Sequence, residues 1–214
     1  MLKTSMHYFR IGWLIALGLV LLTGANCRAE PGAPLKEASA LLHRISGAQV
    51  RPYSTRDFGR TPYSGAISAL VDEAKAPAML VALRKELPAG LLAFIGTTQS
   101  LTKPPVPGVE LVIGQGNGPT DILHIAQTDA VNYGMSNEDL KRRLARWHQA
   151  YGIDIWQAET DTIQLRFIRL PPNLQSFAKE VYEFCPDIVD QGVGTQEALV
   201  QEIRNGKGLQ LWWD

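Results

Sequence analysis

The sequence predicts an α+β fold, in which a mixed, mostly antiparallel sheet and about three packed helices form a single layered domain. Short apolar runs bounded by glycine or proline recur along the chain, as strands do. Three segments in the second half carry apolar residues at helical spacing behind a capping residue. The resulting order, a strand-rich region followed by α, ββ, α, α and β, is typical of layered α+β domains.

The strand-rich region contains four candidate strands and one candidate helix. A strand is expected at 67–71, and a helix at 76–87, where leucines recur on one face. The glycine-bounded apolar run at 90–96 is typical of a buried strand. Segments 109–114 and 122–127 flank the turn sequence GQGNGPT, so we interpret them as the two strands of a hairpin.

The clearest helix covers residues 136–152. Ser136 and Asp139 form a version of the capping box, in which each residue satisfies a backbone N–H that the first helical turn leaves free. Gly152 follows the last apolar position and is expected to end the helix.

The rest of the chain supplies a hairpin, two helices and a last strand. The hairpin joins 153–158 to 162–170, and a helix follows over 173–185. A further helix spans Thr195 to Asn205, with Thr195 as its cap. The last strand is LQLWW, residues 209–213.

Residues 1–29 are typical of a secretory signal. Lys3 and Arg10 make a positive leader before an apolar stretch from Ile11 to Leu22. A membrane span needs about 20 apolar residues, so this stretch fits a signal better than a span. Cys27-Arg28-Ala29 offers a small-x-Ala cleavage site. We therefore expect an exported protein, periplasmic or secreted.

Two alternatives for this segment stay open. Cys27 could be lipidated, although Asn26 before it is a poor fit to a lipoprotein signal. The apolar stretch could also remain as an uncleaved anchor. In both cases the protein would touch a membrane only through its N-terminal segment.

Charge and cysteine content exclude some partners. The whole chain has 21 basic and 21 acidic residues, and cleavage after Ala29 removes three basic and no acidic residues. The mature protein would then carry a net charge of −3, so no basic field is present to bind nucleic acid. Cys185 would be its only thiol, which favours a buried cysteine in an oxidising compartment.

Residues 30–65 are the least domain-like part of the chain. A short helix is possible over 35–45, but the following segment is rich in Gly, Pro, Ser, Thr and Arg. We expect a poorly structured linker or appendage here, followed by the folded domain at 66–214.

The segment FCPDIVDQGVGT, residues 184–195, is the strongest candidate for a polar site. Pro186 is expected to end the preceding helix, and the aspartates can bind nearby backbone N–H groups, so a structural turn explains every residue. The alternative is a metal-assisted hydrolase, in which Asp187, Asp190 and Asp214 would gather and Gln191 would orient water. Because the spacing matches no calcium loop, we predict no metal and no cofactor.

Trp212 and Trp213 are adjacent on the last strand, so their rings should point to opposite faces of the sheet. One ring can fill the core. The other is either covered by a helix or left exposed, and an exposed tryptophan is an anchor for a partner.

Five motifs carry a resemblance to a known family. They occupy about the last three-fifths of the chain: LPAGLLAFIGTT (87–98), TDAVNYGM (128–135), YGIDIWQAETDTIQLRF (151–167), YEFCPDIVDQGVGT (182–195) and LQLWWD (209–214). The chain resembles the bacterial family called domain of unknown function 4253 (DUF4253). The resemblance implies a shared fold and supplies no activity and no catalytic residues.

No assembled catalytic set is evident in the sequence. A nucleophilic Cys185 would need a base, and neither His124 nor His148 lies in a partner motif. Our leading hypothesis is a non-enzymatic, exported module that binds another protein or an envelope component. The candidate surface comprises Asp187, Asp190, Gln191, Trp212, Trp213 and Asp214.

Overall fold

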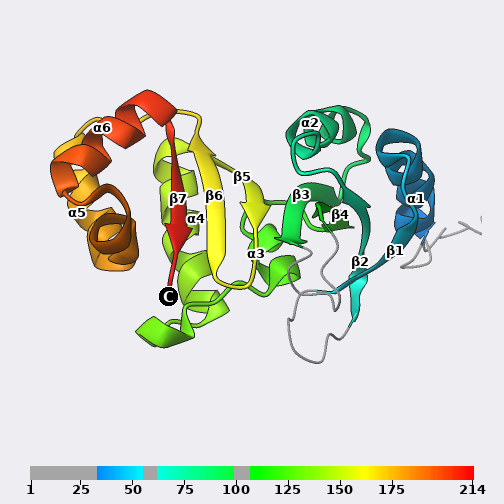
Figure 1. The fold of residues 1–214 in the computed structure, drawn as a ribbon, viewed down its shortest axis with the longest axis horizontal. Coiled ribbons are helices and arrows are strands. Elements are labelled where there is room, and N and C mark those ends of the chain that lie inside the picture. The colour runs from blue at the N-terminus through cyan, green and yellow to red at the C-terminus, as the bar shows by residue number, and fades with distance from the viewer. Residues whose placement is uncertain (1–32, 55–61, 99–106) are drawn as a thin grey trace, which may run out of the picture. The chain divides into compact units, whose positions relative to one another are not determined.

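Seven strands form one mixed sheet in the computed structural model, which describes residues 33–54, 62–98 and 107–214. The strand order across the sheet is β1-β2-β4-β3-β5-β6-β7 (Figure 1). The strands are β1 (Val50–Ser54), β2 (Pro62–Val71), β3 (Leu91–Thr98), β4 (Val109–Gln115), β5 (Ile153–Ala158), β6 (Thr162–Phe167) and β7 (Gly208–Trp212).

Neighbouring strands are antiparallel with one exception. The exception is the central pair β3 and β5, which runs parallel and aligns Ile95 with Gln157. This arrangement confirms the predicted α+β class with a mixed, mostly antiparallel sheet.

Six α-helices pack on the sheet within the described residues. The three predicted in the second half are present, and three more precede them. The helices are α1 (Ala33–Ser46), α2 (Ala76–Glu86), α3 (Asp121–Ala126), α4 (Asn137–Tyr151), α5 (Leu174–Phe184) and α6 (Gln196–Gly206). Two short helical turns, η2 (Val131–Tyr133) and η3 (Ile188–Val193), complete the described elements.

The helices begin where the sequence predicts capping. At α4, the Ser136 hydroxyl accepts from the Asp139 N–H, and the Asp139 carboxylate accepts in return from the Ser136 N–H at 2.8 Å. Thr195 caps α6 in the same way, through the Ala198 N–H at 3.1 Å. Gly152 ends α4 with a φ of +69°, a left-handed conformation that favours glycine.

The core has two parts, one on each face of the sheet. On one face, α1 and α2 cover the β1–β4 region through apolar residues that include Leu42, Leu83 and Leu111. On the other face, α3 to α6 form the larger part, which includes Trp147, Phe177 and Leu211. In Figure 1, α4 lies behind β6 and β7.

Residues 33–54 differ from the predicted linker. The expected helix is present and longer, and β1 follows it as the edge strand beside β2. Tyr53 is fully buried and meets Phe94 edge to face, and Arg51 forms an ion pair with the buried Glu110. β1 belongs to the sheet because it pairs with β2 and buries Tyr53, although the Gly- and Pro-rich composition of 46–65 predicted a loop.

The predicted hairpin of 109–114 with 122–127 was wrong. Residues Asp121–Ala126 form helix α3, and β4 pairs instead with β2 and β3. The Asp121 carboxylate accepts the N–H groups of Asn117 and Gly118, at 2.8 and 3.1 Å, which closes the turn before the helix. The run ILHIA is buried on most sides, so hydrophobic periodicity could not separate helix from strand.

The leader, the cleavage site and the alternative roles of Cys27 fall on residues outside the described ranges. Among the described residues, no helix has both the length and the apolar character that crossing a membrane requires.

Candidate functional site

The acidic loop, residues 184–195, reverses the chain between α5 and α6. Helix α5 ends at Cys185, immediately before Pro186, as the sequence predicted. The loop then forms the π-helical turn η3, and Gly194 exits it with a φ of +82°. The loop is therefore an ordered connection between two packed helices.

Asp187 is the centre of this loop, and its side chain is only 3% exposed. One carboxylate oxygen accepts from the Tyr133 hydroxyl at 2.6 Å and from the Gln191 amide at 3.1 Å. The other oxygen accepts from the Asp214 backbone N–H at 2.9 Å. We call this group of four residues the C-terminal lock, because it ties η2 and the acidic loop to the end of the chain.

The lock also raises the pKa of Tyr133. Its hydrogen bond to Asp187, burial and the nearby negative charge together raise the pKa of the Tyr133 hydroxyl to about 12. The protonated hydroxyl donates to the Asp187 carboxylate, and the raised pKa extends this state to higher pH.

The three predicted metal-binding carboxylates do not gather. Asp190 is exposed and lies beside the Tyr182 hydroxyl at 3.3 Å, and its charge raises the pKa of that hydroxyl. Asp214 reaches Asp187 through its backbone N–H. In the described part of the chain, no group of three or more His, Cys, Asp or Glu is placed to hold a metal ion.

The two adjacent tryptophans differ in burial, and one of them fills the core, as predicted. Trp213 is 2% exposed, donates from Nε1 to the Phe184 carbonyl at 3.0 Å and packs edge to face on the Phe184 ring. Trp212 is half-buried, and a Cβ added at Gly192 would come within 2.9 Å of its ring. The core thus takes Trp213, and the acidic loop covers part of Trp212.

Cys185 is fully buried, in agreement with the prediction of a buried thiol. Its Sγ donates to the Trp212 carbonyl at 3.0 Å. Burial raises the pKa of the thiol to about 11, so the thiolate that nucleophilic catalysis needs is scarce at neutral pH.

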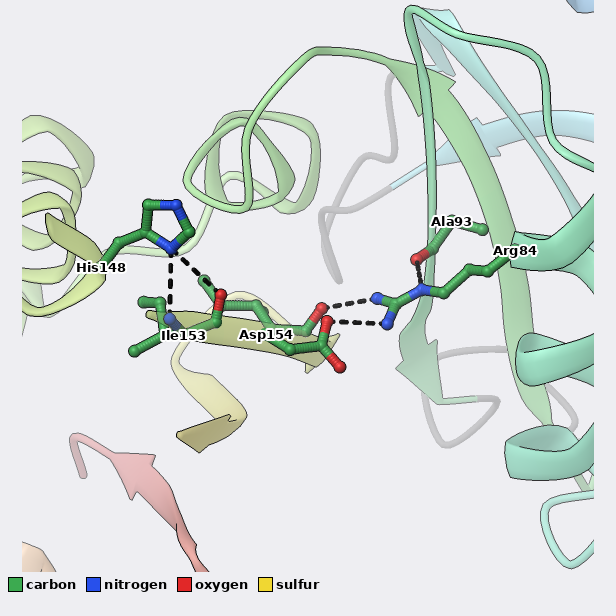
Figure 2. A network of polar contacts seen from close by, with 6 residues as sticks. Arg84, Ala93, His148, Ile153 and Asp154 are labelled. Atoms are coloured by element: carbon green, nitrogen blue, oxygen red, sulfur yellow. Dashed lines mark hydrogen bonds and ion pairs between the residues drawn. The ribbon is translucent and has the colours of Figure 1, made fainter. Parts of the chain in front are cut away.

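A second polar group, which sequence reasoning missed, lies where β3 and β5 run side by side. We call this place the seam. Arg84, from the last turn of α2, donates from Nε to the Ala93 carbonyl of β3 at 2.8 Å. Its two terminal nitrogens donate to β5, to the Asp154 carboxylate and the Ile155 carbonyl, each at 2.7 Å (Figure 2). One guanidinium therefore joins the two strands where the parallel pairing is sparse.

His148 holds the same end of β5 from the opposite side (Figure 2). Its Nδ1 lies 3.1 Å from the Ile153 N and 3.2 Å from the Ile153 carbonyl oxygen, so it accepts from the N–H in one ring tautomer and donates to the carbonyl in the other. The first residues of β5 are thus fixed between His148 of α4 and Arg84 of α2.

A cavity of about 470 Å³ opens at the seam, and we call it the seam cavity. Its polar lining includes Arg84, Asp154 and the Asn117–Gly118 turn. Its apolar lining includes Leu87, Leu91, Leu92, Ile122, Ile153 and Ile168. Ile168 is 73% exposed, so this apolar side chain stands at the cavity without a cover.

The sequence held only a weak signal for the seam. Asp154 is an acidic residue inside an otherwise apolar strand start, and Arg84 is an ordinary cation in the last turn of a helix. They lie 70 positions apart and form no motif, so only the three-dimensional structure brings them together.

Comparison with known proteins gives one match. Residues 110–214 match the family described as "Domain of unknown function (DUF4253)". This confirms the resemblance over those residues, which contain four of the five motifs, whereas LPAGLLAFIGTT lies before the matched range. No curated protein and no solved structure matches the chain.

Proposed function

We propose that the protein is a non-enzymatic binding module, because residues 110–214, which match the DUF4253 family, form a site with α2 and β3. We further propose that it is exported to the cell envelope and binds a small molecule of that compartment in the seam cavity. The observation that carries the proposal is an apolar cavity of about 470 Å³ with an ion pair in its lining.

The size and lining of the seam cavity suit a small molecule. Ligand pockets in proteins typically measure about 300–1,000 Å³ and combine apolar walls with a few convergent polar groups. The seam cavity has both features.

Both members of the Arg84–Asp154 ion pair have polar atoms that can still form hydrogen bonds with a ligand. Arg84 commits three of its five N–H groups to Ala93, Asp154 and Ile155. Among the described residues, Arg84 is the one donor that reaches the Asp154 carboxylate, and it contacts a single oxygen. The Asp154 side chain is 48% exposed, so its second oxygen can accept from a ligand.

The alternative of a metal-assisted hydrolase receives no support from the geometry of its proposed carboxylates. The two oxygens of Asp187 already accept three hydrogen bonds from Tyr133, Gln191 and Asp214. A metal ion would have to displace these donors, and Asp190 is held at Tyr182 instead. The proposal of binding without catalysis leaves the hydrogen bonds of Asp187 and Asp190 in place.

Export rests on the N-terminal sequence alone and is tested separately. We expect that the protein recovered from the producing bacterium starts at Glu30, after cleavage behind Ala29. Intact-mass measurement decides this, because a retained or lipidated N-terminus gives a different mass.

The binding proposal is tested with an uncharged apolar fluorescent probe, 1-anilinonaphthalene. We expect saturable binding to the folded protein that is lost when Ala89→Trp fills the cavity, because Ala89 lines it. The matched control is Val81→Trp, which adds the same ring at an exposed position of α2 outside the cavity lining. Equal probe binding by the wild type and both variants would contradict the proposal.

A further inference from the structure

We infer that the ligand of the seam cavity is a free α-amino acid with a large apolar side chain. This inference rests on the proposed function, since it names the ligand class of the same cavity. It follows from three features of the lining: a cation and an anion side by side, unused bonding capacity on both, and apolar walls around them.

The polar part of the lining has no net charge. Arg84 and Asp154 are in contact at 2.7 Å and are both partly exposed, at 28% and 48% of their side chains. A ligand with only a negative charge would meet the Asp154 carboxylate, and one with only a positive charge would meet the Arg84 guanidinium. A ligand that carries both charges close together avoids either repulsion.

An α-amino acid carries its ammonium and carboxylate groups on the same carbon atom. The ammonium group can therefore donate to the second oxygen of Asp154 while the carboxylate accepts from the two unused N–H groups of Arg84. Figure 2 shows that this second oxygen points away from Arg84, which leaves it open to another donor. In a longer peptide the terminal charges are separated by the backbone, so they cannot both face one adjacent ion pair.

The apolar lining selects the side chain. Leu92, Ile153 and Ile168 contribute to a wall that a ring or a branched alkyl group can contact. A volume of about 470 Å³ leaves room for an aromatic side chain, and Ile168 gains cover when the cavity fills.

The test is calorimetric titration of the full chain with L-phenylalanine and three matched compounds. These compounds are 3-phenylpropionate, which lacks the amine, 2-phenylethylamine, which lacks the carboxylate, and glycine, which lacks the side chain. We expect saturable binding of phenylalanine and at least about tenfold weaker binding of each other compound, because each leaves one feature of the lining unmatched. Equal affinities for phenylalanine and either single-charge analogue would overturn the inference.

A variant assigns the ammonium contact to Asp154. Asp154→Asn keeps an oxygen for Arg84 and removes the negative charge, so we expect about a tenfold loss of phenylalanine affinity and no loss for 3-phenylpropionate. Asp161→Asn, in the exposed turn between β5 and β6, is the control and should bind as the wild type does. Unchanged phenylalanine affinity in Asp154→Asn would also overturn the inference.

The two proposals fail in different ways. If the anilinonaphthalene probe enters the cavity, as Ala89→Trp reports, but phenylalanine neither binds nor displaces it, the amino acid inference is wrong and the binding function stands. If the probe is insensitive to Ala89→Trp, the seam cavity is not a binding site and both proposals are wrong.

Discussion

The C-terminal lock and the seam are both polar clusters that join distant parts of the chain, yet they differ in what they leave unused. In the lock, Asp187 is 3% exposed and its carboxylate accepts three hydrogen bonds. In the seam, Asp154 is half exposed, accepts one bond and lines a cavity. A satisfied, buried polar group stabilises architecture, whereas a partly satisfied one beside a cavity is available for recognition.

The largest expected effect separates the two tryptophans beside the lock. Trp213→Ala should lower the free energy of unfolding by about 3–5 kcal/mol, because it empties a core position and removes the hydrogen bond to Phe184. Trp212→Ala should lower the free energy of unfolding by clearly less, because that ring is only half-buried. Urea unfolding of both variants measures the difference, and equal losses would show that the assignment of Trp213 to the core is wrong.

The next effect separates the two aspartates of the acidic loop. Asp187→Ala should destabilise the protein by about 2–3 kcal/mol, because it leaves Tyr133, Gln191 and the Asp214 N–H without their acceptor. Asp190→Ala should change stability by less than about 0.5 kcal/mol, because that side chain is exposed. A loss in Asp190→Ala as large as in Asp187→Ala would remove the distinction between lock and surface.

A smaller effect is expected at the seam. Arg84→Ala should lower the free energy of unfolding by about 1–2 kcal/mol, because the carbonyls of Ala93 and Ile155 lose their donor. The loss stays small because the Arg84 side chain is partly exposed. Amide hydrogen exchange should become faster in β3 and β5 and stay unchanged in the lock. If exchange became faster throughout the chain, or did not become faster in β3 and β5, the role of Arg84 in connecting these two strands would be contradicted.

The smallest effect concerns pH and the thiol next to the lock. The pKa of Cys185 is raised to about 11, above its ordinary value, so the protonated thiol is favoured in the folded state. Its contribution to stability is complete below the ordinary thiol pKa of about 8.5 and is lost as the pH rises through about 11. In a Cys27→Ser chain at pH 8, a thiol reagent should label Cys185 at least about a hundredfold more slowly than in unfolded protein. Rapid labelling of the folded chain would contradict a buried thiol.

The sequence was most informative where a local pattern determines the structure. The capping box at Ser136, the cap at Thr195 and the break at Pro186 were predicted because each depends on residues a few positions apart. Strand geometry also predicted that one of the adjacent Trp212 and Trp213 would fill the core, and Trp213 does.

The features that the sequence did not predict depend on long-range contacts. Helix α3 could not be separated from a strand, because its residues are buried on most sides and periodicity carries no information there. β1 and its buried Tyr53 were interpreted as a linker, since composition does not show which segment a sheet will accept. The seam combines Arg84 and Asp154 only after the chain has folded.

The central claim is that recognition occurs at the seam and that the lock is structural. Amide chemical shifts of the ¹⁵N-labelled protein, followed during titration with L-phenylalanine, test it most directly. We predict that the shifted amides cluster around Arg84, the Asn117–Gly118 turn and Asp154, with the lock unaffected. Shifts confined to the acidic loop and the residues around Asp214 would contradict the claim.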